Sequence, residues 1–440
     1  MFELNKKPES LLTSAYLLVF LVFFHAFFFA NPPFAAGQDL QDALAEANPS
    51  QASPLINSDN FDNIDEIMRM NQIQAVGTHN SYHLAPDPRL LSRIRFFTKE
   101  VDSWQYSHPP LKIQLQEKNM RQLELDIFPD PQGGLFTDRV GNLLIGEERF
   151  TGIPQLKEPG FKVLHVPFID FETNTYTFIE GLEEIRDWSL ENSNHLPVMV
   201  LVEVKDGLPL DYVSWPLRML IKGGKFLLRI TGEPLSMPLF PGAQDLIEIE
   251  KEIYSVFSKD RIITPDDVRG EHKTLEEAVL KSGWPTLRES RGKVFFALDN
   301  ECRIRDIYLE DNPSLENRIM FTSSRPGNPS AAFIKMNNPM GENEELIREY
   351  VQAGYIVRTR ADANLSEGRT GDRARSEAAF NSGAQYVSTD FPRGWESYND
   401  YAENFTDYTV TLPEADRFPA RCNPVNGVLF CSEFVLKNLE

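Results

Sequence analysis

The chain has 440 residues, of which 41% are hydrophobic and 25% are charged, and this length is enough to bury one large core or two modest ones. The composition is that of a globular protein rather than a disordered one. The formal net charge of −21 argues against a general nucleic-acid binder, because neutralising phosphates requires a surplus of Lys and Arg. An anionic substrate would have to be attracted by a local feature of its site.

The N-terminal segment has the features of an export signal. Lysines precede an apolar run over 11–30, and the small residues Ala35 and Gly37 follow it as candidate cleavage positions. The run is about 20 residues long, which is also enough to span a bilayer, so an uncleaved membrane anchor is the alternative. A buried core helix fits poorly, because the run is apolar on all sides. We therefore expect a secreted or periplasmic protein, with residues 1–37 as its signal peptide or anchor.

The rest of the chain divides into three parts by composition. Residues 38–62 are rich in Ala, Asn, Asp, Gln and Ser without sustained periodicity, which is typical of a linker. Residues 63–393 carry recurring strand and helix patterns and are expected to form the folded domain. Residues 394–440 form an aromatic, acidic C-terminal extension.

The chain contains only three cysteines. It has no Cys-x-x-Cys pair and no Cys/His cluster, which excludes a zinc site built on thiolates. Any metal must therefore be held by oxygen ligands or histidines. In an oxidising compartment Cys422 and Cys431 could close a small hairpin, which would leave Cys302 as a free thiol.

Short β-rich runs recur along the domain, and several are separated by segments in which apolar residues have helical spacing. The strand candidates are 73–79, 121–128, 161–168, 197–205, 293–300, 317–323, 355–362 and 385–391, and the helical patterns are 177–190, 274–282, 343–353 and 370–382. Strands that alternate with helices pair in parallel, and eight apolar strands with polar C-terminal ends favour an α/β fold of the (β/α)8 TIM-barrel type. The active site of such a barrel lies where the strands end.

Carboxylates lie at several of these strand ends. Glu124 and Asp126 are two residues apart on one strand, so their side chains point to the same face. Buried together they would need a cation or a shared proton, although a solvated strand face paired to Lys or Arg is the structural alternative. Asn80 at the end of the first expected strand and Glu203 at the end of the fourth supply further oxygen atoms. This ligand set suits a hard cation, Ca²⁺ or Mg²⁺.

Two histidines also lie where apolar runs stop, His79 in GTHNSYH and His165 in VLHVPF. Either one alone is more often a structural histidine. Beside a carboxylate cluster they make an acid–base pair, because imidazole titrates near neutral pH. Cleavage of a phosphodiester needs a deprotonated nucleophile, offset charge on the phosphate oxygens and a protonated leaving oxygen, which two histidines and one metal ion can supply.

The ordered motifs GTHNSYH, LELD, VLHVPF and VEVK resemble those of the calcium-dependent, bacterial-type branch of the phosphoinositide-specific phospholipase C superfamily. The resemblance extends over 71–393 and implies a barrel of the PLC-like phosphodiesterase type. It implies that His79 and His165 are catalytic and that Lys205 faces the substrate phosphate or head group. It implies Ca²⁺ rather than Mg²⁺ as the cofactor. The calcium ligands that it implies are Asn80, Glu124, Asp126 and Glu203.

In this family a hydroxyl of the inositol ring attacks the adjacent phosphorus, which releases diacylglycerol and a cyclic phosphate; such internal attack gains from proximity. Arg358 and Arg360 either bind the ring or phosphate, or are structural arginines at a strand end. The apolar insertion 208–241 either touches the lipid surface at the rim of the site or packs on the outside of the barrel.

Two rival functions share the barrel. A glycerophosphodiester phosphodiesterase has the same Glu-x-Asp pair, but its usual first motif is His-Arg-Gly, whereas this chain has His79-Asn80-Ser81. The other rival is a catalytically silent exported barrel that acts as a binding protein. Retention of both histidines and of every expected ligand argues against it.

Overall fold

The structure is a computed structural model that describes residues 64–95, 100–167, 169–205 and 238–427. The expected signal or anchor, the linker, Cys431 and most of the insertion 208–241 lie outside the described residues. Within the described ranges, no helix has both the length and the apolar character needed to cross a membrane.

Eight parallel strands form the centre of the molecule, in the order β6-β5-β4-β2-β1-β9-β8-β7. A parallel bridge between Ser323 and Phe333 brings the two ends of this order together, so the sheet is a nearly closed barrel. The expected TIM-like barrel is therefore confirmed. The strands are β1 (Ile73–Thr78), β2 (Gln122–Phe128), β4 (Val198–Val204), β5 (Val294–Leu298), β6 (Met320–Thr322), β7 (Phe333–Lys335), β8 (Ile356–Arg360) and β9 (Tyr386–Thr389).

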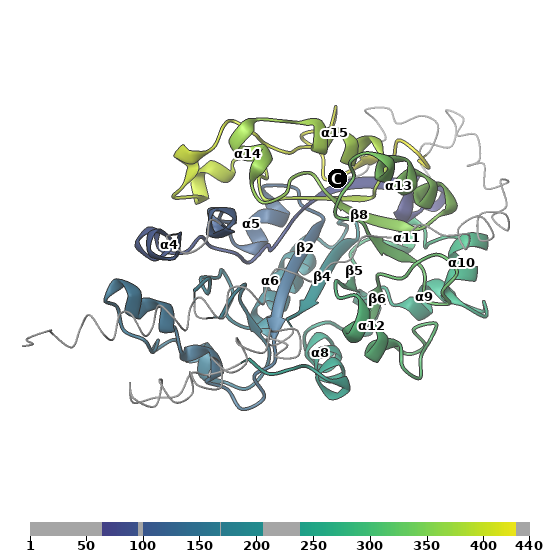
Figure 1. Cartoon of the computed structure of the whole chain (residues 1–440). Coiled ribbons are helices and arrows are strands. Elements are labelled where there is room, and N and C mark those ends of the chain that lie inside the picture. Colours follow the sequence, from purple (N-terminus) through teal and green to yellow (C-terminus); the bar gives the residue numbers. More distant parts are fainter. Residues whose placement is uncertain (1–63, 96–99, 168, 206–237, 428–440) are drawn as a thin grey trace, which may run out of the picture.

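Helices connect the parallel strands and surround them (Figure 1). Several begin at a threonine whose side chain accepts a main-chain N–H, as Thr177 does before α6. The helices are α3 (Ile64–Ile67), α4 (Pro88–Arg95), α5 (Leu111–Gln116), α6 (Phe178–Glu191), α8 (Ala243–Val256), α9 (Pro265–Arg269), α10 (Leu275–Lys281), α11 (Leu287–Ser290), α12 (Cys302–Leu309), α13 (Glu342–Ala353), α14 (Ser366–Thr370) and α15 (Ala374–Asn381).

One predicted barrel strand is wrong, and one barrel strand of the structure was not predicted. The run 161–168 contributes only β3 (Lys162–Val163), which pairs antiparallel with the end of β2 and is not a barrel strand. Its apolar residues indicate burial, but the chain then turns back, because Val166 bridges Asp170. The missing strand is β7, which at three residues is too short to show a period in the sequence.

The described part of the C-terminal extension packs against the barrel. Trp395 is buried, and its Nε1 donates to the main-chain oxygen of Tyr408 at 2.9 Å. Strand β10 (Arg421–Cys422) pairs antiparallel with β1. Cys422 is disulfide-bonded and Cys302 is an exposed free thiol, whereas the expected partner, Cys431, lies outside the described residues.

Gly77 allows β1 and β2 to approach each other, and we expect Gly77→Ala to destabilise the fold. Gly77 is paired with Gln122, and a Cβ at Gly77 would lie 2.2 Å from Oε1 and 2.5 Å from Cβ of Gln122. The expected loss in the free energy of unfolding, measured in urea, is about 1–3 kcal/mol. The control is Gly152→Ala, where an added Cβ meets nothing within 4 Å. Equal stability of the two variants would contradict this packing.

Candidate active site

His79 and Asp390 form a pair because their strands are neighbours. His79 follows β1 and Asp390 follows β9, and the register places Thr78 beside Thr389. His79 Nδ1 lies 2.8 Å from Asp390 Oδ1, and His79 Nε2 lies 3.8 Å from Glu124 Oε1. Burial and the nearby Arg360 lower the pKa of His79 to about 3, although Asp390 opposes them. The ring is therefore neutral, with Nδ1–H donated to Asp390 and the lone pair of Nε2 toward the carboxylates.

His165 is also oriented by a carboxylate, but it does not end a barrel strand as the sequence predicted. It lies in the loop after β3, where its Nδ1 is 2.6 Å from Asp170 Oδ2. About one fifth of each side chain is exposed, 20% for His79 and 19% for His165.

A series of aromatic rings shows that the two histidines lie on the same side of the barrel. The ring centroid of Tyr106 lies 6.3 Å from that of His79 and 4.2 Å from that of His83. The His83 ring in turn meets the His165 ring edge to face, with centroids 5.6 Å apart. The structure therefore brings the two expected catalytic residues to one face.

Three of the expected metal ligands lie together because of strand register. Asp126 on β2 is paired with Glu203 on β4, and Glu124 is two residues earlier on the same face. One carboxylate oxygen from each of the three lies within 4.8 Å of the others. Asp126 Oδ1 is buried and has no hydrogen-bond partner among the described residues. An unpartnered carboxylate oxygen in an all-oxygen cluster fits a hard cation such as Ca²⁺.

Asn80, the fourth expected ligand, follows directly after His79 and has a positive φ of 45°. Its Nδ2 donates to the Tyr106 hydroxyl at 2.9 Å. This hydrogen bond fixes the amide and leaves the carbonyl oxygen Oδ1 as the atom that could bind a cation. The main chain ties the residue to β2, because the next residue, Ser81, donates its N–H to the main-chain oxygen of Glu124 at 2.9 Å.

Basic side chains balance these carboxylates. Lys205 Nζ lies 2.7 Å from Asp126 Oδ2 and 2.7 Å from Glu203 Oε2. Arg358 is almost completely buried inside the barrel, 2.5 Å from Glu124 Oε2. Burial nevertheless raises the pKa of Glu124 to about 8, with Arg358 opposing the shift.

A family model decides which proteins this chain is related to. The model described as Ca²⁺-dependent phosphoinositide phospholipase C matches residues 68–424. The chain belongs to this family. A search of curated proteins finds no match.

Solved structures of phospholipases of this kind are similar to the chain at low identity. The calcium-dependent phosphoinositol-specific phospholipase C from Pseudomonas sp is 15% identical, with 81% of this chain and 97% of that chain covered and a TM-score of 0.46. A Ca²⁺-dependent phosphatidylinositol-specific phospholipase C from Streptomyces antibioticus is 17% identical, covers 73% and 95%, and has a TM-score of 0.43. The enzyme from Listeria monocytogenes is 12% identical, covers 77% and 95%, and has a TM-score of 0.36.

Several charged residues of this site were given no role from the sequence. Asp299, after β5, is held by Lys335 at the end of β7, with Nζ 2.7 Å from Oδ2. Asp299 and Asp390 both follow strands, so their position was a usable signal. Asp170 and Lys335 gave none, because one lies in a loop and the other ends a strand too short to recognise.

The expected substrate-binding arginines have protein partners in the structure. Arg360 NH2 lies 2.9 Å from Asp390 Oδ2, so it supports the carboxylate that orients His79. Arg358 also donates to Ser388 Oγ at 2.7 Å, deeper in the barrel. Contact of either arginine with substrate stays a prediction.

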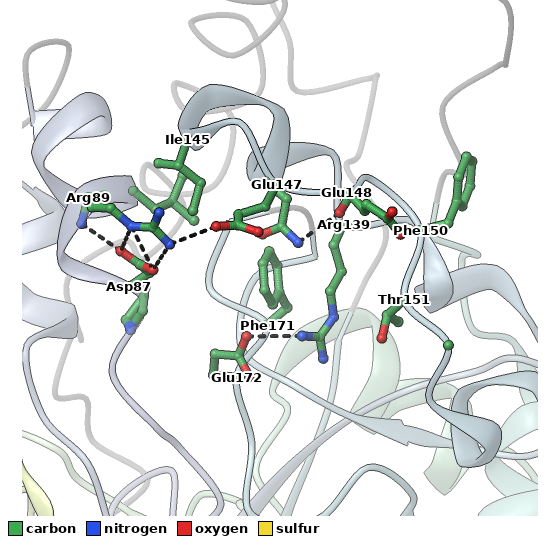
Figure 2. Close-up of a pocket in the computed structure, with 14 residues that line it drawn as sticks. Asp87, Arg89, Arg139, Ile145, Glu147, Glu148, Phe150, Thr151, Phe171 and Glu172 are labelled. Atoms are coloured by element: carbon green, nitrogen blue, oxygen red, sulfur yellow. Dashed lines mark hydrogen bonds and ion pairs between the residues drawn. The ribbon is translucent and has the colours of Figure 1, made fainter.

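A separate cavity of about 500 Å³ lies beside the His165 loop in this member of the phospholipase family. It is lined by residues of the β2–β3 connection and of α4, and none of the expected site residues is in its wall. Figure 2 shows Arg139 paired with Glu172 in the cavity wall; Arg139 NH1 lies 3.0 Å from Glu172 Oε1. The Arg139 guanidinium carbon also lies 4.5 Å from the centroid of the Phe171 ring. Phe171 follows directly after Asp170, so the cavity wall and the His165 loop are continuous in sequence.

The contacts of Asp390 with His79 and Arg360 predict how the stability of the fold depends on pH. Burial alone raises the pKa of Asp390, but His79 and Arg360 more than reverse this and hold it well below its usual range. An acid with a depressed pKa stabilises the fold above the pKa of the unfolded chain, about 3.9, and this contribution is lost as the pH falls below that value. Asp390→Asn should therefore lower the free energy of unfolding at pH 7, and the gap to wild type should shrink below about pH 4.

Urea unfolding at a series of pH values measures this gap. The exposed Asp400 gives the control, because Asp400→Asn should follow wild type throughout. A gap between Asp390→Asn and wild type that stayed constant down to the lowest pH would contradict the ion pair between Asp390 and Arg360.

Proposed function

We propose that this chain is an exported Ca²⁺-dependent phosphodiesterase that cleaves a phosphoinositide-type phospholipid into diacylglycerol and an inositol phosphate, with a cyclic phosphate formed first. One observation carries the proposal. Two histidines, each oriented by its own carboxylate, share one face of the barrel with a cluster of oxygen ligands. Family membership supports the reaction class, and this geometry supports the roles proposed for the residues.

His79 is suited to act as the base. Asp390 accepts the hydrogen bond from Nδ1–H, so Nε2 has the lone pair needed to accept the proton of the attacking ring hydroxyl. As that oxygen bonds to phosphorus, the bond from phosphorus to the diacylglycerol oxygen breaks. The leaving oxygen takes a proton from Nε2 of His165, whose Nδ1 is held by Asp170. A water molecule can then open the cyclic phosphate with the two histidines in exchanged roles.

Asn80, Glu124, Asp126 and Glu203 are the residues that would hold Ca²⁺. When bound there, the ion would offset the negative charge on the non-bridging phosphate oxygens. Lys205 lies against two of these ligands, which supports its expected contact with the phosphate. Arg360 is partly exposed at the same end of the barrel and is the better placed of the two arginines to reach a ring hydroxyl, because Arg358 is buried.

The proposed substrate implies that the protein works at a membrane surface. Exposed apolar side chains on loops that follow strands support this: Phe150 after β2 is 47% exposed, and Leu239 and Phe240 after β4 are 42% and 53% exposed. Leu239 and Phe240 belong to the expected lipid-contacting insertion 208–241, the rest of which lies almost entirely outside the described residues. The export segment 1–37 would deliver the protein there, either free or anchored.

Removal of either histidine tests the reaction. We expect His79→Ala and His165→Ala each to lower kcat on phosphatidylinositol vesicles by about 10²–10⁴-fold, because general acid–base catalysis contributes that much. The control is His272→Ala, since His272 is a partly exposed histidine outside the site, and its Nε2 hydrogen-bonds the Ser282 hydroxyl. Unchanged turnover in His79→Ala would dismiss the mechanism. Turnover of glycerophosphocholine in preference to phosphatidylinositol would favour the glycerophosphodiesterase alternative.

Calcium binding can be tested without substrate. Ca²⁺ at 100 times its Kd should stabilise the fold by about 2.7 kcal/mol, visible as a rise in Tm that a chelator reverses. Asp126→Asn should abolish this rise. Asp130→Asn is the matched control, because Asp130 follows the same strand but pairs with Lys162 outside the cluster. A Ca²⁺-dependent rise that survived in Asp126→Asn would contradict the ligand set.

A further inference from the structure

His83 has no exposed surface, and both of its ring nitrogens face hydrogen-bond acceptors. Nδ1 lies 2.9 Å from the main-chain oxygen of Tyr106. Nε2 lies 2.9 Å from Oδ1 and 3.0 Å from Oδ2 of Asp170. The ring therefore lies between a peptide carbonyl and a carboxylate.

The two acceptors that face the ring nitrogens decide the charge of the His83 ring. A peptide carbonyl can only accept, so Nδ1 must be protonated, and an ionised carboxylate can only accept, so Nε2 must be protonated too. Asp170 Oδ2 also accepts from His165 Nδ1, at 2.6 Å. A neutral His83 would leave the lone pair of Nε2 facing the oxygens of Asp170, which is unfavourable in a buried site.

The electrostatics of the pair point the same way. Burial lowers the pKa of His83, but Asp170 and the Tyr106 carbonyl raise it by more, and the net direction is upward. Burial raises the pKa of Asp170, but His83 and His165 lower it by more, and the net direction is downward. Both shifts favour an ion pair over a neutral pair.

Two other buried histidines show that burial alone does not require a second proton. His108 Nε2 donates to the main-chain oxygen of His79 at 2.9 Å, and His108 Nδ1 has no hydrogen-bond partner among the described residues. His195 faces the Leu196 carbonyl with Nδ1 and the Ser189 hydroxyl with Nε2, and the hydroxyl can donate. A neutral ring satisfies each of these sites. Burial lowers the pKa of both residues to about 4.

We propose that His83 is a positioning residue, a buried imidazolium that neutralises Asp170 and holds its carboxylate in the place where it orients His165. This inference rests on the proposed function, because it concerns how His165 is prepared for proton transfer. It assigns to the second histidine of the GTHNSYH motif a role that needs no contact with substrate.

The pairing matters for the orientation of His165. Asp170 Oδ2 accepts a hydrogen bond from His165 Nδ1 at 2.6 Å, and His83 Nε2 holds the same carboxylate at 2.9 Å from Oδ1. The His83 and His165 rings meet edge to face, with centroids 5.6 Å apart. His165 therefore keeps its Nδ1–H bond to Asp170, which leaves Nε2 as the ring nitrogen that can face substrate. The other titratable groups that face His83 are Asp390, the Tyr106 hydroxyl and His108.

The protonated ring also excludes a metal from this cluster. His83, His165 and Asp170 each present a ligand atom within 4.8 Å of the others, so the spacing alone would suit a metal ion. A metal binds a ring nitrogen through its lone pair, and an imidazolium has none. In this cluster the proton on His83 Nε2 takes the place that a metal ion would occupy.

Nitrogen NMR of the full chain tests the charge of His83 directly. The protein is labelled with ¹⁵N-histidine, saturated with Ca²⁺ and recorded from pH 6 to pH 8. We expect both ring nitrogens of His83 to show the protonated pattern throughout, while His108 in the same spectrum shows a neutral ring. A neutral pattern for His83 at pH 7, or a pattern that changes when Zn²⁺ is added and returns with a chelator, would overturn the proposal.

Variants assign the signals and test the effect on His165. In His83→Gln the Nδ1–H proton of His165 should exchange with solvent about tenfold faster or more, because Asp170 loses the cation that holds its carboxylate against that N–H. His195→Gln, a buried histidine outside the site, is the matched control and should leave this exchange rate unchanged. An unchanged exchange rate in His83→Gln would also overturn the proposal.

These readouts do not require turnover, so their failure is distinguishable from failure of the proposed function. If His83→Gln does not fold, His108→Gln and His195→Gln still assign the other buried rings, and the charge of His83 is read from the wild-type protein.

Discussion

Carboxylates at the carboxyl ends of adjacent strands can be buried only if protons or cations lie within hydrogen-bonding distance, and this constraint shapes the whole mouth of the barrel. The register of β2 and β4 places Asp126 beside Glu203, and Lys205 bridges the two. Arg358 reaches Glu124 from across the barrel. These basic side chains still leave Asp126 Oδ1 without a hydrogen bond among the described residues. A divalent cation bound there would give this oxygen a partner.

The same requirement governs the two histidines. Each has one ring nitrogen fixed by a carboxylate, Asp390 for His79 and Asp170 for His165, so the other nitrogen is directed by the fold rather than by substrate. The two carboxylates are in turn balanced by different cations. Arg360 lies beside Asp390, and the ring of His83 lies beside Asp170. This difference gives the two histidines different surroundings, which the proposed acid and base of one reaction require.

The sequence predicted the barrel, and the position of most candidate-site residues within it, because both follow from simple periodicities. Strand alternation placed Glu124 and Asp126 on one face, and the position of His79 and Asn80 at the end of an apolar run placed them at the mouth. Prediction from the sequence failed where the structure depends on contacts between residues far apart in the chain. The run around His165 was read as a barrel strand because it is apolar, yet it is an antiparallel appendage of β2. The pairing of His83 with Asp170 spans 87 residues of chain and leaves no local pattern.

The central claim is that this face of the barrel cleaves a phosphodiester by internal attack with the help of Ca²⁺. Phosphorus NMR of phosphatidylinositol incubated with the full chain follows the substrate, the cyclic phosphate and the linear phosphate in one spectrum. The account predicts that the cyclic phosphate appears first, only when Ca²⁺ is present, and that the linear phosphate follows. Direct formation of the linear phosphate without a cyclic intermediate, or equal turnover in the presence of a chelator, would contradict it.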